Sequence, residues 1–163
     1  MNGPAAERQW VLLSYRVPRE PSTPRITVWR KLKRLGVGQI SDGLVALPAD
    51  ARTQEQLEWI AEEVTDFGGT ATVWIAHPAA AGHEQQLVVD MAQARTVEYQ
   101  QVLAQAEDAR GAGDTERRRV LAKLRAELRR IQRRDYFPPP ARLAAERAVE
   151  ALHPANTTEM STP

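Results

Sequence analysis

The period of the hydrophobic pattern changes once along the chain, near residue 80, and this change constrains the fold more than any single motif. Before it, short apolar runs alternate with helical patterns; after it, about 70 residues rich in Ala, Gln, Glu and Arg carry no strand signal. We therefore expect an α+β domain over residues 8–78 and a helical region over residues 83–153. The tail over residues 154–163 has the composition of a disordered segment.

The first half predicts the element order β-α-β-β-α-β, which is that of a ferredoxin-like split βαβ unit. The expected elements are a strand at 10–17, a helix from Ser22 or Thr23 to Gly36, a hairpin or bent strand around Ser41-Asp42-Gly43, a helix at 52–67 and a strand at 70–77. Pro24 in the first turn and Gly36 after the last turn fit the start and the end of the first helix.

The second half predicts an antiparallel helical arm. One helix is expected at about 83–110, GAGD turns the chain, and a second helix spans about 115–134. The segment YFPPP then breaks this helix before a short last helix, packed on the hairpin, that ends near Leu152. Because the turn between the two long helices is short, they should pack side by side as a hairpin.

The net charge of +1 conceals a strong asymmetry along the chain. Seven Lys and Arg residues fall in 16–34 against Glu20, and nine fall in 117–134 against Glu127. These two segments hold 16 of the 22 basic residues. Such blocks indicate either solvated helix faces or contact with an anionic partner.

Five charged residues lie on faces that otherwise look internal: Arg25, Arg95, Glu98, Asp135 and Arg142. Arg25 is also in the first turn of its helix, where free N–H groups and the helix dipole favour an anion. Two interpretations stay open. The residues form salt bridges that lock the arm onto the α+β domain, or guanidinium groups bind a tetrahedral oxyanion, with Arg25 and Arg95 as inner ligands.

Exposed cations would supply an outer electrostatic field around such a site. They are Arg30, Lys31 and Arg34 on the first helix, and Arg129 and Arg133 on the arm. Chromate, sulfate and the DNA backbone are the anionic partners that these residues suggest, and DNA contacts of this kind would be largely independent of sequence.

The four tryptophans are expected in the core. Trp10 and Trp74 lie in strand patterns, and Trp29 and Trp59 lie in helix stripes. Their spacing among basic residues is too sparse for a platform that stacks single-stranded nucleic-acid bases.

Several classes of function lack support in the sequence. The chain has no cysteine, and its three histidines do not have the spacing of metal ligands. It also has no nucleophile elbow, P-loop or dinucleotide-binding motif. We therefore expect a non-enzymatic protein without a cofactor or a metal. Since no apolar run is long enough to span a membrane and no export signal is present, we expect a cytoplasmic protein.

Four stretches resemble the N-terminal region of ChrB-type proteins from bacterial chromate-resistance operons: WVLLSYRVP, PRITVWRKLKRLGVGQISDGLVALP, ARTVEYQQVL and LRRIQRRDYFPPPAR. The first of these regions also looks like the ferredoxin-like domain of PaaX-type repressors and Cas2 nucleases, which supports the split βαβ unit. Full-length members of the ChrB family carry a further C-terminal domain, which this chain, ending at Pro163, is expected to lack.

The resemblance implies a regulatory or sensor protein linked to chromate, an oxyanion similar to sulfate in shape and charge. One alternative is a dimeric interaction module that pairs through its sheet edge or helical arm and binds no small ligand. Another is a metal-dependent nuclease of the Cas2 type. Those nucleases use an acidic residue at the end of the first strand, where this chain has Tyr15-Arg16-Val17, so nuclease activity is not carried over.

Overall fold

The computed structural model describes residues 8–156 and divides into two compact units. The sheet unit runs to Met91, and the helical unit begins at Ala92. This boundary falls within helix α3 (Gln85–Ala109), so the first turns of α3 belong to the sheet unit. Of the tail expected to be disordered, residues 154–156 form a short 3₁₀ turn and residues 157–163 lie outside the described range.

The sheet unit confirms the α+β, ferredoxin-like prediction. Its four strands form an antiparallel sheet in the order β2-β3-β1-β4, with β1 at the centre between β3 and β4. The elements are β1 (Trp10–Arg16), α1 (Thr23–Leu35), β2 (Gly38–Ser41), β3 (Leu44–Pro48), α2 (Ala51–Asp66) and β4 (Thr70–Ala76). The predicted hairpin is formed by β2 and β3, whose turn is Asp42-Gly43.

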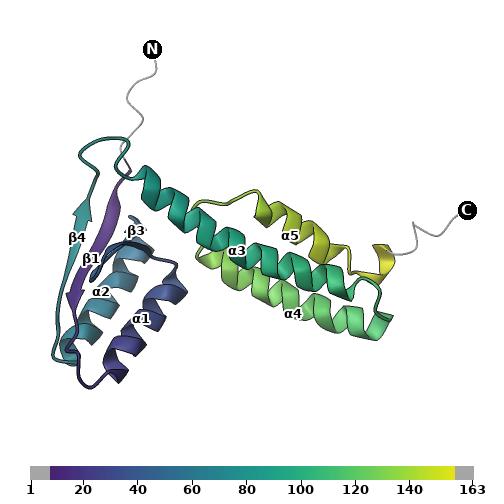
Figure 1. Cartoon of the computed structure of the whole chain (residues 1–163), viewed down its shortest axis with the longest axis horizontal. Coiled ribbons are helices and arrows are strands. Elements are labelled where there is room, and N and C mark those ends of the chain that lie inside the picture. Colours follow the sequence, from purple (N-terminus) through teal and green to yellow (C-terminus); the bar gives the residue numbers. More distant parts are fainter. Residues whose placement is uncertain (1–7, 157–163) are drawn as a thin grey trace, which may run out of the picture. The chain divides into compact units, whose positions relative to one another are not determined.

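The core of the sheet unit lies between α1, α2 and one face of the sheet. Figure 1 shows both helices on the same side of the strands. Alternate residues of the central strands are fully buried on this side, since successive side chains of a strand point to opposite faces. The buried residues are Val11, Leu13, Val45 and Leu47 from the strands, Val28 and Leu32 from α1, and Leu57, Ile60 and Val64 from α2.

Among residues 8–156, the opposite face of the sheet is covered over β2 but not over Trp74 of β4. One row of register partners on this face crosses all four strands, from Gly38 through Ala46 and Leu12 to Trp74. At the β2 end, the first turns of α3 lie so close that a methyl group on Gly38 would be 2.8 Å from Sδ of Met91. At the β4 end, the side chain of Trp74 is 54% exposed.

The expectation that all four tryptophans are core residues is wrong for two of them. Trp10 is buried, but Trp74 and Trp59 are 54% and 62% exposed. Trp59 lies about 200° around the helix from Leu57, away from the buried stripe of α2. Trp74 belongs to β4, which pairs with a strand on one side only within the described part of the chain.

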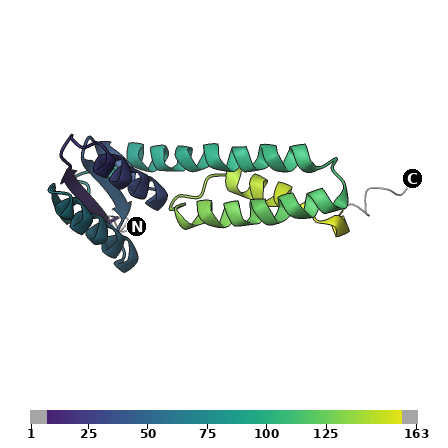
Figure 2. The ribbon, with the colours of Figure 1, turned by 90° about the horizontal axis from the view of Figure 1, so that it is seen from below.

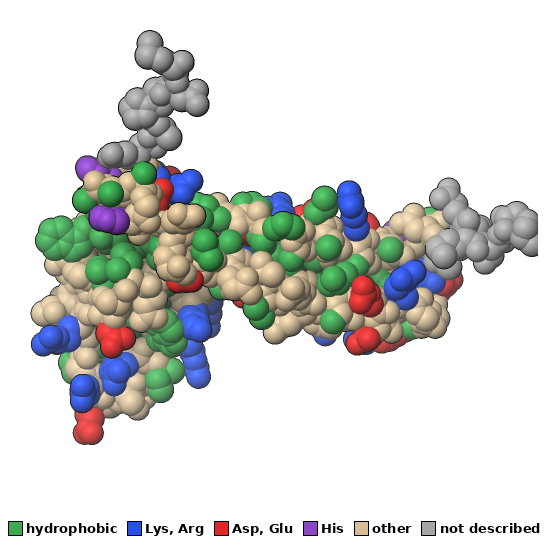
Figure 3. Space-filling view, turned by 45° about the horizontal axis from the view of Figure 1, so that its top comes forward, with side chains coloured by type: hydrophobic (Ala, Val, Ile, Leu, Met, Phe, Trp, Pro, Cys, Tyr) green, Lys and Arg blue, Asp and Glu red, His purple; other side chains and the backbone are tan. Residues whose placement is uncertain are grey.

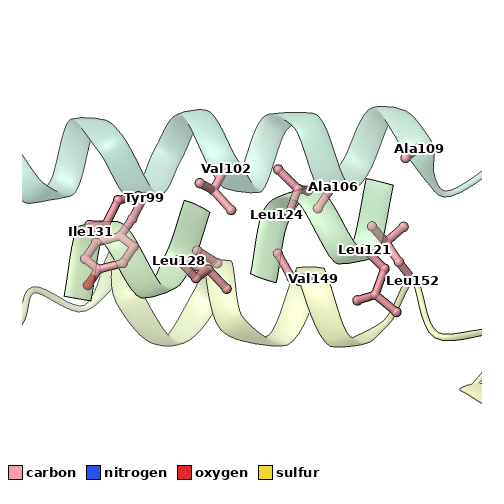
Figure 4. Close-up of a cluster of buried hydrophobic side chains, with 11 residues drawn as sticks. Tyr99, Val102, Ala106, Ala109, Leu121, Leu124, Leu128, Ile131, Val149 and Leu152 are labelled. Atoms are coloured by element: carbon pink, nitrogen blue, oxygen red, sulfur yellow. The ribbon is translucent and has the colours of Figure 1, made fainter. Parts of the chain in front are cut away.

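The helical unit has its own apolar core, built by the remainder of α3, α4 (Asp114–Arg133) and α5 (Ala141–Glu150). Figure 2 shows α4 and α5 running along α3. In Figure 4, Tyr99 and Val102 of α3 and Leu124 and Leu128 of α4 point into the space that α5 closes. The short last helix is therefore part of the core, because Ala145, Val149 and Leu152 are fully buried. No helix among residues 8–156 is long and apolar enough to cross a bilayer.

The β2–β3 turn offers a test of this fold. Gly43 has φ of 72°, and a Cβ added to it would lie 2.6 Å from the carbonyl oxygen of Tyr15. We expect Gly43→Ala to lower the free energy of unfolding by about 1–3 kcal/mol, because it adds both a left-handed alanine and a clash with the backbone. Thermal denaturation followed by circular dichroism measures this.

Gly82→Ala is the matched control, since a methyl group added to Gly82 would have no neighbouring atom within 4 Å and its φ is not in the left-handed region. If Gly43→Ala and Gly82→Ala lower the free energy of unfolding equally, the turn assigned to Asp42-Gly43 is contradicted.

Candidate functional site

The main candidate site is a groove at the end of the sheet unit where β1 leads into α1. It encloses about 1080 Å³. The end of β1 and the following loop supply Arg16 and Arg19, and the first turns of α1 supply Arg25 and Trp29. The β2–β3 turn and the glycines before β4 complete its walls through Asp42, Gly43, Gly68 and Gly69. We call this the basic groove.

The charge of the basic groove is strongly positive. Of the residues that the structure describes, three arginines line it, and Asp42 is the one carboxylate in its lining. Within residues 8–156, none of these arginines has a carboxylate within 4.0 Å. The N-terminus of α1 also opens here, with no acidic residue in its first turn and no side-chain cap on Ser22. Both features favour an anion, since unpaired helix N–H groups carry partial positive charge.

Tyr15 adds a hydrogen-bond donor to the groove. Partial burial raises the pKa of its hydroxyl above the ordinary value; Arg25 acts in the opposite direction, and Asp42 reinforces the rise. The phenol therefore stays protonated at neutral pH and can donate to an anion. The ring of Trp29 is less available to contact a ligand, because Nζ of Lys33 lies 5.1 Å from the centroid of this ring.

The structure corrects the predicted burial of Arg25. Its side chain is exposed, although helical spacing aligns it with the buried Val28 and Leu32. The reason is its position in the first turn of α1, which borders the open groove instead of the strands that cover the later turns. Arg25 therefore faces solvent in the groove and not the interior.

The other cations proposed on α1 do not line the groove. Arg30 and Arg34 are exposed on the helix surface. Lys31 instead donates to both carboxylate oxygens of Glu63 on α2, at 2.7 and 2.6 Å. This bridge joins the two helices that cover the sheet.

In the helical unit, Arg95 and Glu98 lie together in a largely buried ion cluster. Nε of Arg95 is 2.9 Å from Oε2 of Glu98, although its N–H does not point at that oxygen. Arg134 donates to the other oxygen of Glu98 at 2.7 Å, and its carbonyl accepts from Arg95 at 3.4 Å. Burial lowers the pKa of Arg95, whose side chain is only 12% exposed, while Glu98 opposes this change.

Asp135 and Arg142 lie beside this cluster in a second, partly buried network. The carboxylate of Asp135 is fully buried and accepts a 2.7 Å hydrogen bond from the hydroxyl of Tyr99. Nη1 of Arg142 is 3.9 Å from the same oxygen, and its Nε donates to Glu146. Burial and the bond to Asp135 raise the pKa of Tyr99. In the structure these charges are therefore paired with one another inside the helical unit.

The remaining predicted residues, Arg129 and Arg133, are exposed on α4 in the helical unit. Of the predicted site residues, Arg25 alone lines the basic groove. It is joined there by Arg16 and Arg19, which belong to the basic segment 16–34 but were not among the predicted site residues. Their position in the sequence could have indicated them, because Arg19 lies in the loop 17–22 between β1 and α1, and Arg16 and Arg25 lie on either side of this loop. Among residues 8–156, no three His, Asp or Glu side chains gather as metal ligands would.

Comparison with known proteins gives two matches. The profile of the family described as "Protein ChrB, N-terminal" matches residues 25–159. The curated Protein ChrB of Cupriavidus metallidurans is 28% identical over 144 residues, which cover 86% of this chain. The alignment spans 44% of the length of that relative, so this chain corresponds to less than half of it. No solved structure shows significant similarity to the chain.

The Tyr99–Asp135 contact yields a stability prediction. Tyr99→Phe removes one oxygen atom and leaves the buried carboxylate of Asp135 without this hydrogen-bond donor. We therefore expect the free energy of unfolding to fall by about 1–3 kcal/mol. Chemical denaturation measures the change. Tyr15→Phe is the control, because its hydroxyl has no hydrogen-bond partner within the part of the chain that is described. An equal fall in the free energy of unfolding of both variants would contradict a stabilising hydrogen bond between Tyr99 and Asp135.

Proposed function

The chain belongs to the ChrB N-terminal family, and on this basis we propose that it serves as a chromate-resistance-type regulatory or sensor protein whose basic groove binds an oxyanion or a DNA phosphate. The observation that carries the proposal is the set of three arginines in one groove without carboxylate partners among the described residues. In this proposal the basic groove binds the anion and carries out no catalytic step.

The chemistry of the groove suits a tetrahedral dianion. A guanidinium group can donate two parallel N–H···O hydrogen bonds to a pair of oxygens, and Arg16, Arg19 and Arg25 would supply three such groups. The first turn of α1 adds backbone N–H groups, and Tyr15 adds a neutral donor. Chromate, sulfate and a phosphodiester present the same kind of oxygen to these donors.

Arg95 is the weaker candidate of the two inner ligands expected from the sequence. An anion that reached it would have to displace Glu98, which also accepts from Arg134. Removing one member of a buried ion pair leaves an uncompensated charge, which is costly. The proposal therefore assigns anion binding to Arg25 and its neighbours, and a structural role to Arg95, Glu98, Asp135 and Arg142.

The exposed arginines of α4 support the DNA version of the proposal. Arg118, Arg129 and Arg133 lie within about 60° of one another around the helix, since 11 and 15 residues correspond to nearly whole numbers of turns. Such a row can follow a phosphate backbone, with affinity that falls steeply as salt rises.

Calorimetric titration of the full chain with chromate, sulfate and phosphate tests the oxyanion version. We expect saturable heat with the wild type, and affinity about tenfold lower in Arg25→Ala, because a hydrogen bond to a charged group contributes about 1.5–3 kcal/mol. Arg25→Lys should recover part of the loss, since it keeps the charge but not the fork. If none of the three anions gives saturable heat, the oxyanion version of the proposal is rejected.

Arg119→Ala is the control for charge. It removes an equally basic side chain from the helical unit, where Arg119 is exposed and paired with Glu116, and should leave the titration unchanged. Arg95→Ala should lower stability more than affinity; an effect on affinity as large as that of Arg25→Ala would move the site to the ion cluster.

A gel-shift titration at low and at physiological salt tests the DNA version. We expect binding at low salt that weakens strongly at higher salt, and a smaller salt dependence in a variant with Arg129 and Arg133 both changed to Ala, because each phosphate contact contributes to the slope. Absence of a shifted band even at low salt would reject DNA binding by this chain.

A further inference from the structure

The sheet of the sheet unit has two unlike edges. At one edge, β2 is four residues long, its pairing with β3 shifts register between Gln39 and Ser41, and α3 packs against Gly38. Short, irregular and covered strands are how proteins prevent pairing with another chain. At the other edge, β4 is seven residues long and pairs with β1 along its whole length without a break.

Strand β4 has none of the features that block pairing. Its sequence TATVWIA contains no charged residue, no proline and no glycine, in a chain in which 26% of residues are charged. Trp74 and Ile75 are 54% and 50% exposed and, as neighbours on a strand, point to opposite faces. Hydrophobic side chains gather along the side of the sheet unit where β4 runs (Figure 3).

We propose that β4 is the edge through which two copies of this chain pair, antiparallel and about a two-fold axis at Val73, to form one continuous sheet. The two-fold axis places Thr72 of each copy opposite Trp74 of the other, and Ala71 opposite Ile75. An identical partner fits because the strand is uncharged, so that its pairing with itself brings no like charges together.

The side chains suit this register on both faces. On the face away from α1 and α2, the two Trp74 rings become diagonal neighbours, about 7–8 Å apart at the backbone and within reach of each other. Nε1 of each ring donates to the hydroxyl of Ser14 on β1 at 3.0 Å, so each ring turns from β1 toward the edge when the two rings meet. On the helix-covered face, the two Val73 side chains meet at the axis, flanked by both copies of Ile75.

The chain flanking β4 does not oppose the pairing. Gly68 and Gly69 precede the strand, and His77 and Pro78 follow it. In the proposed register Gly69 lies opposite His77, so the ends of the strand also bring no like charges together. A seven-residue edge is small for a protein interface, which places the expected dissociation constant in the micromolar range.

Sedimentation velocity of the full chain over a range of concentrations tests the proposal. We expect a monomer–dimer equilibrium in the wild type and a dissociation constant about thirtyfold or more higher in Trp74→Glu, as for the loss of a central aromatic anchor. Trp59→Glu is the matched control, because Trp59 is the other exposed tryptophan and lies on α2; it should dimerise like the wild type.

Cross-linking then tests the register. The chain has no cysteine, so Val73→Cys introduces a single thiol, which at the two-fold axis lies within disulfide distance of its own copy. We expect oxidation to trap a covalent dimer of Val73→Cys but not of Trp59→Cys. The proposal is overturned if the wild type remains monomeric even at high micromolar concentration, if Trp74→Glu dimerises normally, or if the cysteines at 59 and 73 cross-link equally.

Discussion

The hydrogen bonding of β1 on both of its sides is the constraint on which the rest of the sheet unit depends. Residues of β1 pair with β3 on one side and with β4 on the other, in a continuous antiparallel register. This register turns Val11 and Leu13 toward the helices and fixes the position of Arg16, the last residue of the strand. The basic groove exists because the chain leaves the sheet there and returns as α1.

The two units treat their charges in opposite ways. The helical unit largely encloses Arg95, Glu98 and Asp135 and gives each of them a partner, so that these charges hold α3 against the end of α4. The sheet unit leaves Arg16, Arg19 and Arg25 exposed around a groove whose described lining contains one carboxylate. A buried charge must be compensated within the protein, whereas an exposed group of like charges is compensated by solvent, by salt or by a ligand. This difference is why binding is proposed for the groove and not for the cluster.

More of the fold than of the candidate site could be predicted from the sequence. Periodicity, Pro24 and Gly36 were enough for the α+β class and the ferredoxin-like order, because helix and strand patterns are local. Burial of Arg25 was predicted from the same periodicity and was wrong, since the face of a helix is buried only where another element covers it. For the same reason the exposure of Trp59 and Trp74 could not be predicted from hydrophobicity.

The sequence by itself determined the elements, their order and the two basic segments, because these depend on residues a few positions apart. Only the tertiary structure decided that Arg16, Arg19 and Arg25 share one groove, that Arg95 lies beside Glu98, which Arg134 also binds, and that among residues 8–156 no strand follows β4 at its edge of the sheet. Each of these facts depends on segments that are distant in the chain. Their proximity is set by strand pairing and core packing, which no local pattern of residues encodes.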